Sequence, residues 1–388
     1  MQSDVEVSIV MPCLNEADTI EVCVLKGLKA LKDANISGEV IVADNGSTDG
    51  SQGIGDRAGA RVVPVTAKGY GNALRGGIAA AKGRFIIMGD ADDSYDFLEV
   101  PKFVSKWREG YELVQGCRLP RGGGQVKPGA MPWSHRWIGN PMFTLMARTM
   151  FKSPINDIYC GLRGFTPELY RRLDLRCHGM EFATEMIIKA SLHGAKISEV
   201  PITLHPDGRK AHAPHLRTFR DGWRTLRFFL IFSPRWLFLL PGCLLVLFGL
   251  LGYGLALPAV KVGVVTLDAH TLLFASLAML LGYQSILFSI FAKTFAINEG
   301  LLPKDPQLDG FFKVMYLERG LILGLLGLLA GVSLLGAAVW QWWGANFGSL
   351  DYAKTMRWVI PGVTMTALGF QTILSSFFVS ILGLKKSE

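Results

Sequence analysis

The chain has 388 residues, of which 50% are hydrophobic and 19% are charged, and its formal net charge is +8. This length allows two or more domains. The hydrophobic residues are unevenly distributed, because residues 1–235 have a mixed composition whereas charged residues become sparse after Trp236. The composition therefore excludes a single soluble domain and predicts a soluble domain followed by a membrane domain.

The six cysteines bear on the compartment of the soluble domain. No two of them form a C-x-x-C motif, and no His lies beside them at zinc-binding spacing. The first residues lack the basic segment of a secretory signal peptide, and disulfides need an oxidising compartment. We therefore expect reduced thiols in a cytoplasmic domain, most of them acting as small buried hydrophobic residues.

The first hundred residues alternate between strand-like and helix-like segments. Apolar runs predict strands over residues 6–12, 38–51 (ending in a polar turn), 60–65 and 84–92. Helical spacing of apolar residues predicts helices over 16–34 and 70–83. Strands that alternate with helices form βαβ units, so the pattern predicts a mostly parallel sheet.

The middle of the chain is less regular. Residues 118–132 are rich in Gly, Pro and Arg and predict a mobile loop. Residues 135–154 combine apolar bulk with basic flanks, which indicates an amphipathic helix. Residues 179–202 are predicted to form a helix followed by a strand.

A basic helix is predicted before the apolar part of the chain. Arg217, Arg220, Arg224 and Arg227 recur every three or four residues, and so share one helical face. This pattern predicts an interfacial amphipathic helix, and it explains the positive net charge better than nucleic-acid binding does. We therefore expect a soluble domain (1–215), an interfacial helix (216–235) and a membrane domain (236–388).

Four apolar segments follow, and each meets the roughly 20 residues needed to cross a bilayer core of ~30 Å. Four crossings place both ends of the chain on one side, and the basic helix and Lys385-Lys386 place that side in the cytoplasm. We expect a multi-pass protein of the inner (cytoplasmic) membrane with both termini cytoplasmic. The spans are expected at about residues 236–257, 271–297, 321–343 and 357–384.

Polar residues follow three of the predicted strands, where parallel sheets bind ligands. Asp90 and Asp92 form a D-x-D motif after an apolar run. Two such carboxylates suit Mg²⁺ that also holds a diphosphate, and a solvated acidic turn is the alternative. Asp93 is expected to assist the pair, whereas Asp96 is expected either to start a helix or to lie at the surface.

Asp44 ends the second strand, where its carboxylate is expected to accept hydrogen bonds from a nucleobase or ribose. Ser47 and Asp49 are expected to cap the following helix. Glu16 is either a helix N-terminal charge or a nucleotide contact. The chain contains no P-loop motif.

Arginines after the acidic residues predict phosphate contacts. Arg118 follows a probable strand, Arg163 is expected in a turn, and Arg209 and Arg217 belong to the basic run of residues 205–217. Arg binds phosphates in a bidentate manner. Attraction to lipid headgroups is the alternative for the basic run, and a lipid phosphate would satisfy both.

Five segments occur in a common order along residues 6–235: VSIVMPCLNEADTI, VIVADNGSTDGS, RFIIMGDADDSY, DIYCGLRGF and GMEFATEMIIKA…ISEVPI. In this order and spacing they resemble the family 2 glycosyltransferases, within the dolichyl- and polyprenyl-phosphate sugar synthase branch. One segment alone is a weak signal, but the shared order makes the resemblance specific. Four C-terminal spans also suit this branch.

The resemblance implies an α/β fold: a GT-A nucleotide-sugar-binding domain followed by an all-α membrane domain of four transmembrane helices. It implies that Asp90 and Asp92 bind a metal, Mg²⁺ or Mn²⁺, and the donor diphosphate. Ser94 stands where the family often has a further metal-binding Gln, so a third protein ligand stays open. The implied nucleotide-sugar site consists of these two aspartates together with Pro12, Asn15, Glu16 and Asp44.

The resemblance also implies an acceptor-phosphate site. Arg118 and Arg163 match arginines near the donor or acceptor phosphates, and Glu185 stands where the family has an acid. The family's basic run is replaced by HPDGRKAHAPHLR, in which Arg209 and Arg217 are the equivalents, so this site stays open. Arg118 is also expected to be catalytic, together with the D-x-D pair.

The implied reaction is an inverting hexosyl transfer. A lipid-phosphate oxygen attacks the anomeric carbon of a UDP- or GDP-linked sugar, glucose or mannose, and the nucleoside diphosphate leaves. Because the acceptor is already an anion, a strong general base is not required. The metal and arginines stabilise the leaving diphosphate. The expected partners are a sugar nucleotide, polyprenyl or dolichyl phosphate and the membrane, with no nucleic acid.

Three other functions would leave different signals in the sequence. A processive polysaccharide synthase should carry a Q-x-x-R-W motif, and no Gln precedes Arg235-Trp236 at that spacing. A flippase or transporter should carry charges inside its spans. Few are present here, and the clearest, Lys293, lies near the end of a span. The intact D-x-D motif argues against an inactive membrane anchor.

Overall fold

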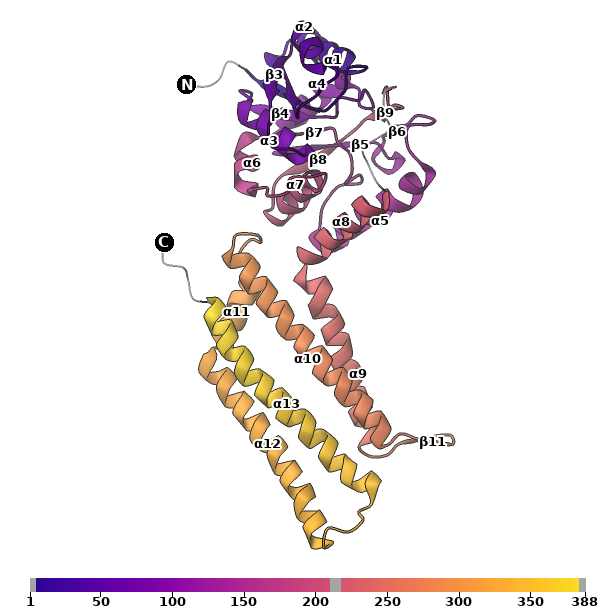
Figure 1. The fold of residues 1–388 in the computed structure, drawn as a ribbon, viewed down its shortest axis with the longest axis vertical. Helices are drawn as coiled ribbons and strands as arrows, with labels where there is room; N and C mark the ends of the chain where they lie inside the picture. The colour runs from indigo at the N-terminus through magenta and orange to yellow at the C-terminus, as the bar shows by residue number, and fades with distance from the viewer. Residues whose placement is uncertain (1–4, 210–217, 384–388) are drawn as a thin grey trace. The chain divides into compact units, whose positions relative to one another are not determined.

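The computed structural model describes residues 5–209 and 218–383 (Figure 1). The chain forms two compact units, Met1–Phe229 and Leu230–Glu388. The first unit is built on a sheet with helices packed against it, and the second consists almost entirely of long helices. All six cysteines are free thiols, and four of them are buried.

A seven-stranded sheet forms the centre of the first unit, in the order β3-β2-β1-β4-β7-β5-β8. β1 pairs in parallel with β2 and β4, whereas β7 is antiparallel to both β4 and β5. The mostly parallel sheet predicted from the sequence is confirmed. The strands are β1 (Val7–Cys13), β2 (Gly38–Asp44), β3 (Arg61–Pro64), β4 (Phe85–Met88), β5 (Leu113–Cys117), β7 (Arg163–Phe165) and β8 (Ile197–Pro201).

Helices cover both faces of this sheet. A Cβ placed on Gly27 of α1 would touch Ile9, whereas one on Gly77 of α3 would touch Val10. Neighbouring residues of a strand point to opposite faces, so α1 and α3 lie on opposite faces of β1. The helices of this unit are α1 (Ile20–Asp33), α2 (Ser51–Arg57), α3 (Tyr70–Ala80), α4 (Val100–Arg108), α5 (Asn140–Phe151), α6 (Pro167–Leu173), α7 (Glu181–Leu192) and α8 (Thr218–Ile231).

Burial on both faces explains the apolar runs of the central strands. Every residue of β4 is buried, as are six of the seven residues of β1. Strands covered on both faces need continuous apolar runs rather than alternation. The abrupt change at Gly89 therefore marks the edge of the sheet, where the chain leaves the core.

Two segments differ from the sequence-based expectation. Arg163 was expected in a turn but begins β7, a three-residue antiparallel strand. The predicted loop 118–132 contains a short helical turn, η2 (Pro120–Gly122), and β6 (Gln125–Val126), which pairs with β9 (Thr203–Leu204). Strands this short carry no readable period, because alternation needs at least four residues to be recognised.

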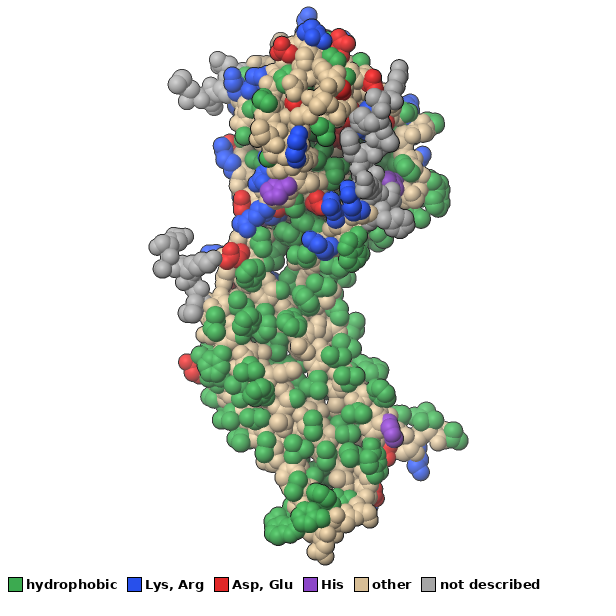
Figure 2. Space-filling model, in the orientation of Figure 1, with side chains coloured by type: hydrophobic (Ala, Val, Ile, Leu, Met, Phe, Trp, Pro, Cys, Tyr) green, Lys and Arg blue, Asp and Glu red, His purple; other side chains and the backbone are tan. Residues whose placement is uncertain are grey.

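The second unit contains four helices that are long and apolar enough to cross a membrane: Arg235–Ala256, Ala269–Asn298, Leu317–Gly344 and Tyr352–Gly383. They coincide with the four expected spans. On the face drawn in Figure 2, hydrophobic side chains cover these helices. The elements are η4 (Arg235–Leu239), α9 (Leu240–Ala256), β10 (Lys261–Val262), β11 (Val265–Thr266), α10 (Ala269–Asn298), α11 (Pro306–Val314), α12 (Leu317–Gly344) and α13 (Tyr352–Gly383).

Small and hydroxyl-bearing residues hold these helices together. A Cβ on Gly242 of α9 would lie 2.8 Å from the carbonyl oxygen of Gly282 in α10, so the two backbones meet closely. The Tyr253 hydroxyl lies 2.6 Å from Ser276 Oγ and donates to Thr364 Oγ1 at 3.0 Å, which links α9, α10 and α13. Close approach and interhelical hydrogen bonds are the contacts available where lipid removes the hydrophobic driving force.

Candidate active site

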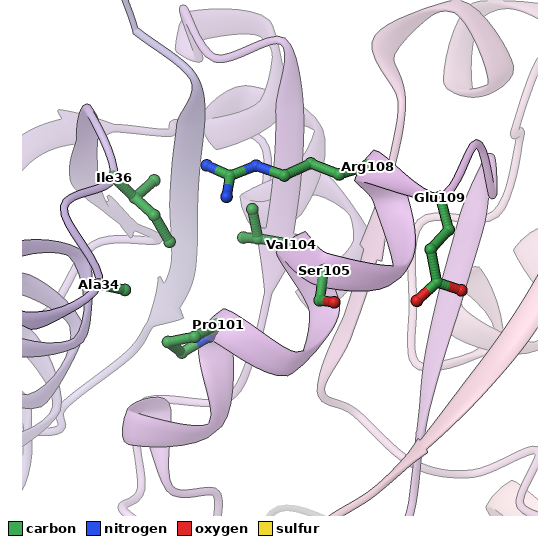
Figure 3. A pocket seen from close by; sticks show the side chains of 7 residues that line it. All are labelled: Ala34, Ile36, Pro101, Val104, Ser105, Arg108 and Glu109. Carbon is green, nitrogen blue, oxygen red and sulfur yellow. The ribbon is translucent and has the colours of Figure 1, made fainter.

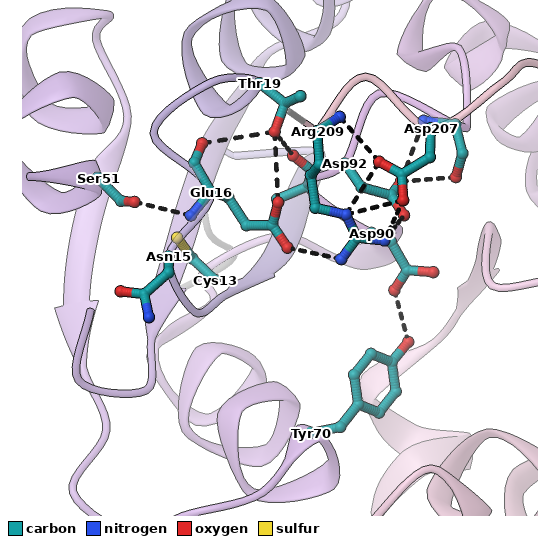
Figure 4. A network of polar contacts seen from close by, with 12 residues as sticks. Cys13, Asn15, Glu16, Thr19, Ser51, Tyr70, Asp90, Asp92, Asp207 and Arg209 are labelled. Carbon is teal, nitrogen blue, oxygen red and sulfur yellow. Dashed lines mark hydrogen bonds and ion pairs between the residues drawn. The ribbon is translucent and has the colours of Figure 1, made fainter. Parts of the chain in front are cut away.

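Three strands end side by side at one edge of the sheet. Cys13 at the end of β1 pairs with Asp44 at the end of β2, and Val10 pairs with Met88 at the end of β4. The polar residues after these strands therefore converge, as expected for a parallel sheet. Figure 4 shows the resulting network of hydrogen bonds and ion pairs.

Asp90 is the first acid after β4, and it is held by a tyrosine. The Tyr70 hydroxyl donates to Asp90 Oδ1 at 2.9 Å (Figure 4). Burial, followed by the negative charge of Asp92, raises the pKa of Asp90 to about 6. A carboxylate that is costly to ionise is one that a bound cation would strongly stabilise.

Asp92 differs, because both of its carboxylate oxygens have partners. Its Oδ1 accepts the Ser94 backbone N–H at 3.0 Å and the Ser94 hydroxyl at 2.6 Å. Its Oδ2 accepts from Arg209 Nη2 at 3.0 Å. Ser94, the residue at the place of the family's Gln, therefore orients Asp92.

The other two acids of the motif have separate contacts. Asp93 forms an ion pair with Lys26 at 2.7 Å. Asp96 accepts the backbone N–H of Leu98 and caps the short turn η1 (Phe97–Glu99), as predicted. Of the four clustered carboxylates, Asp90 and Asp92 are thus the two that face the network of Figure 4.

The loops after β1 and β2 are tied to each other. Asp44 accepts the backbone N–H groups of Gly46 at 2.9 Å and Ser47 at 3.2 Å. Ser47 was expected to cap a helix, but its hydroxyl instead accepts the backbone N–H of Asn15. Asp49 does accept the N–H of Ser51, the first residue of α2, at 3.0 Å. Through its two backbone acceptor bonds, Asp44 thus holds the loop that follows β2.

Glu16 and Arg209 bring two distant segments together. Glu16 is 7% exposed, and its Oε1 lies 3.2 Å from Arg209 Nη1. Its backbone N–H donates to the Ser51 hydroxyl. Arg209 thus lies among the residues predicted to bind the sugar nucleotide. Arg217, the other predicted arginine of this run, lies outside the described residues.

Arg118 is fixed by an acid that the sequence did not reveal. Its Nε and Nη2 each lie 2.8 Å from the carboxylate oxygens of Asp157, which is fully buried. Its Nη1 lies 3.4 Å from the hydroxyl of Tyr95. Because Asp157 engages one side of the guanidinium, it orients the remaining nitrogen.

A cavity of about 290 Å³ joins Arg118 to Asp90 within the first unit. Burial, followed by the positive charge of Arg118, lowers the pKa of His135 on its wall. Apolar side chains form much of the remaining wall. The lining includes Tyr70, Asp90, Arg118, Met131, Pro132, His135, Asn140, Phe143, Tyr159, Met180, Glu181, Thr184 and Thr225.

Arg163 and Glu185 are buried beneath this cavity's walls rather than on them. Arg163 is fully buried and donates to the carbonyl oxygens of Cys160 and Ala183, the second of which lines the cavity. Glu185 is 1% exposed and pairs with Lys189 at 2.9 Å. The described geometry therefore gives both side chains protein partners and no direct access to the cavity.

A second hollow, of about 350 Å³, lies elsewhere on the first unit (Figure 3). It is lined by residues that follow α1 and by α4, and Arg108 on its wall pairs with Glu6 at 2.8 Å. It contains none of the residues that follow β1, β2 or β4. The converging polar side chains thus lie at the strand ends and not in this hollow.

The residues that sequence reasoning missed are partners of residues it found. Tyr70 binds Asp90, Asp157 binds Arg118, and Asp207 binds Arg209. Tyr70 and Asp207 lie in glycine-rich and basic stretches, and Asp157 is the first residue of the quoted segment DIYCGLRGF, which was the one signal that could have found it. Within residues 5–209 and 218–383, no group of three or more His, Cys, Asp or Glu is arranged to hold a metal ion.

Fold and site together define a GT-A enzyme domain followed by a membrane-spanning helical region. Residues 8–173 match the model of glycosyl transferase family 2, and residues 290–383 match that of the glycosyltransferase family 2 C-terminal transmembrane region. The chain is 36% identical over 377 residues to the low-salt glycan biosynthesis hexosyltransferase of Haloferax volcanii, covering 97% of this chain and 89% of that protein. This chain belongs to glycosyltransferase family 2.

Two further comparisons match a little more than half of the chain. The chain is 29% identical over 217 residues to the dolichyl-phosphate hexose transferase of Haloferax volcanii, covering 56% of this chain and 89% of that protein. A glucosyl-3-phosphoglycerate synthase structure from Mycobacterium tuberculosis, in complex with phosphoglyceric acid, matches with 22% identity and a TM-score of 0.47. That match covers 59% of this chain and 80% of the synthase chain. The expected family, fold class and glycosyltransferase activity are confirmed by the family and relatives.

Proposed function

We propose that this membrane glycosyltransferase moves one hexose, glucose or mannose, from a UDP- or GDP-sugar to polyprenyl or dolichyl phosphate with inversion. The observation that carries the proposal is that Asp90 and Arg118 line one cavity. An acid suited to a metal-bound diphosphate and a cation suited to a phosphate thus face the same space. The two Haloferax relatives, a hexosyltransferase and a dolichyl-phosphate hexose transferase, support the hexose and the lipid acceptor.

The donor nucleotide is assigned to the loops after β1 and β2. Asp44 and Asn15 order these loops through hydrogen bonds to backbone N–H groups, at 2.9 Å to Gly46 and 2.9 Å to Thr48. Pro12 and Glu16 belong to the same edge of the sheet. Loops positioned by a rigid sheet are the usual carriers of ligand contacts in α/β folds.

Asp90 and Asp92 fit Mg²⁺ or Mn²⁺ held jointly with the donor diphosphate. Both supply the oxygen ligands that such cations prefer, and two carboxylates with substrate phosphates are a common set for Mg²⁺. When bound, the cation would neutralise charge that develops on the leaving diphosphate. The Tyr70 and Ser94 hydroxyls hold the two carboxylates in place.

The acceptor phosphate is assigned to Arg118, which lines the cavity together with Asp90. Asp157 fixes the guanidinium in a bidentate geometry, so binding a phosphate costs little side-chain entropy. Phe143 and Met131 on the wall offer apolar contact to the first part of a lipid chain. Arg163 and Glu185 would support the cavity from behind.

The membrane arrangement is also part of the proposal. Arg220, Arg224 and Arg227 are exposed on α8, as an interfacial helix requires. Four apolar helices follow, and an even number of crossings places both termini on one side. We assign that side to the cytoplasm of a multi-pass inner-membrane protein, because the basic residues flank the first and last crossings.

A pair of neighbouring substitutions tests the assignment. Purified protein in detergent is given radiolabelled UDP- or GDP-hexose, polyprenyl phosphate and Mn²⁺, and the lipid product is extracted. We expect Asp92→Asn to lower transfer by on the order of 10²-fold or more, the loss typical of removing charge stabilisation. Asp93→Asn, whose carboxylate pairs with Lys26, should retain most activity. Normal transfer by Asp92→Asn would show that the acidic pair is not the donor site.

A further inference from the structure

Arg209 lies between carboxylates of the donor site (Figure 4). Its guanidinium nitrogens lie 3.2 Å from Glu16 Oε1, 3.0 Å from Asp92 Oδ2 and 2.5 Å from Asp207 Oδ2. The side chain is only 10% exposed. Three acids from separate parts of the chain thus converge on one guanidinium.

This contact occupies the oxygen that a metal would need. Asp92 Oδ1 already accepts two hydrogen bonds from Ser94, and Oδ2 accepts from Arg209. A divalent cation must approach a carboxylate oxygen to about 2.0–2.1 Å. A cation there would be repelled by a guanidinium on the same oxygen. Arg209 and the metal are therefore alternative partners of Asp92.

The backbone that carries Arg209 is attached to the acidic loop. The Gly208 N–H donates to the Asp92 carbonyl oxygen at 2.9 Å, and the His205 N–H donates to the Ser94 carbonyl oxygen at 2.9 Å. The Arg209 N–H donates to Asp207 Oδ1 at 2.9 Å. With its backbone held, only the Arg209 side chain has to move to release Asp92.

We propose that Arg209 is a positioning residue that holds Asp92 and Glu16 before the donor binds, and that the donor diphosphate draws its guanidinium away and so opens Asp92 to the metal. This inference rests on the proposed sugar-nucleotide site. A planar guanidinium exchanges carboxylate for phosphate oxygens with little geometric change, because both accept in a bidentate manner. Metal and nucleotide then bind cooperatively, and the coupling is reciprocal.

The test measures Mn²⁺ binding without any reaction. The full-length protein in detergent is titrated with Mn²⁺, and free aqueous Mn²⁺ is followed by electron paramagnetic resonance. We expect Arg209→Ala to bind Mn²⁺ alone about tenfold more tightly than the unsubstituted chain, in line with typical coupling between sites. Adding UDP or GDP should tighten Mn²⁺ binding strongly in the unsubstituted chain and much less in Arg209→Ala.

Two further variants distinguish the loss of the Arg209–Asp92 contact from the loss of any positive charge near the acidic loop. Lys26→Ala also removes one positive charge near the acidic loop, but Lys26 pairs with Asp93 rather than Asp92. It should change Mn²⁺ affinity little. Arg209→Lys keeps the charge and should lie between the unsubstituted chain and Arg209→Ala. Thermal unfolding of each variant confirms that it is folded.

Equal or weaker Mn²⁺ binding by folded Arg209→Ala would overturn the inference, as would an equal gain in Lys26→Ala. Transfer by the unsubstituted chain is measured in parallel with UDP- or GDP-hexose and polyprenyl phosphate. Its absence with all donors would count against the proposed function itself. Transfer with unchanged Mn²⁺ affinity in Arg209→Ala would count against the role of Arg209 alone.

Discussion

At the scale of single residues, the site consists of charged groups whose charges are costly to bury. Asp90 illustrates the cost, because burial and then the charge of Asp92 raise its pKa from 3.8 to about 6. The protonated carboxyl therefore contributes stability below pH 3.8, and this contribution is lost as the pH rises through about 6. Near neutral pH, the metal-free protein holds an ionised Asp90 at a cost in stability.

This cost predicts opposite effects of one substitution on stability and activity. Asp90→Asn keeps an acceptor for the Tyr70 hydroxyl and removes the buried charge. We expect it to abolish transfer and to raise the Tm of the metal-free protein near neutral pH. The gain in Tm should vanish at about pH 4, near the ordinary pKa of Asp. A lower Tm for Asp90→Asn near neutral pH would contradict the account.

The buried pair of Arg118 and Asp157 predicts a large loss when one partner is removed. The side chains are 9% and 0% exposed, so Asp157→Ala leaves a buried guanidinium without its counter-charge. We expect a loss of about 3–5 kcal/mol, seen as a lower Tm in detergent together with weak transfer. Asp33→Ala is the matched control, because Asp33 pairs with Lys29 on the exposed surface. Equal Tm values for the two variants would show that the buried pair is not a structural anchor.

At the scale of elements, periodicity predicted the long segments and missed the short ones. β1, β2, α1 and the four apolar helices carry enough residues to show a pattern, whereas β6 and β7 have two and three residues. The sequence placed Asp90, Asp92 and Arg118 at strand ends, where the structure has them. Their partners were not predictable, since Asp157 lies 39 residues from Arg118 and Asp92 lies 117 residues from Arg209. Such pairs depend on how strands and loops are arranged, which residue spacing does not encode.

The packing of α3 on the sheet yields a prediction about Gly77. A Cβ there would lie 2.5 Å from Val10 Cγ1 and 2.9 Å from Ala43 Cβ, both buried in the sheet that carries the site. We expect Gly77→Ala to lower stability by about 1–3 kcal/mol through overpacking, measured as a lower Tm. Gly53→Ala in α2 is the control, since its Cβ would meet only the flexible end of Arg57. A Tm for Gly77→Ala at or above that of Gly53→Ala would contradict this packing.

At the scale of the whole molecule, the chain joins a glycosyltransferase domain to four helices that are long and apolar enough to cross a membrane. Aromatic side chains mark one end of the spans, with Trp340, Trp342 and Trp343 in the last turns of α12. Trp is enriched where a span meets the membrane interface. The proposed topology places this end, and the β10–β11 turn between the first two spans, outside the cytoplasm.

Labelling of introduced cysteines in intact cells tests this topology. A Cys177→Ser, Cys243→Ser background keeps only the four buried native thiols. In it, Val264→Cys introduces a thiol at the exposed β10–β11 turn, and Lys304→Cys introduces one between the second and third spans. We expect a membrane-impermeant maleimide to label Val264→Cys in intact cells and Lys304→Cys only after permeabilisation. The reverse pattern would invert the orientation and place the enzyme domain outside.

The central claim is that the D-x-D edge and the Arg118 cavity together transfer one hexose to a lipid phosphate. Mass spectrometry of the lipid product tests it most directly, after incubation of the purified chain with polyprenyl phosphate, Mn²⁺ and UDP- or GDP-hexose. We predict a polyprenyl phosphate that carries one hexose, with the anomeric configuration opposite to that of the donor. A ladder of products with several sugars, a retained configuration, or no lipid-linked sugar with any donor would contradict it.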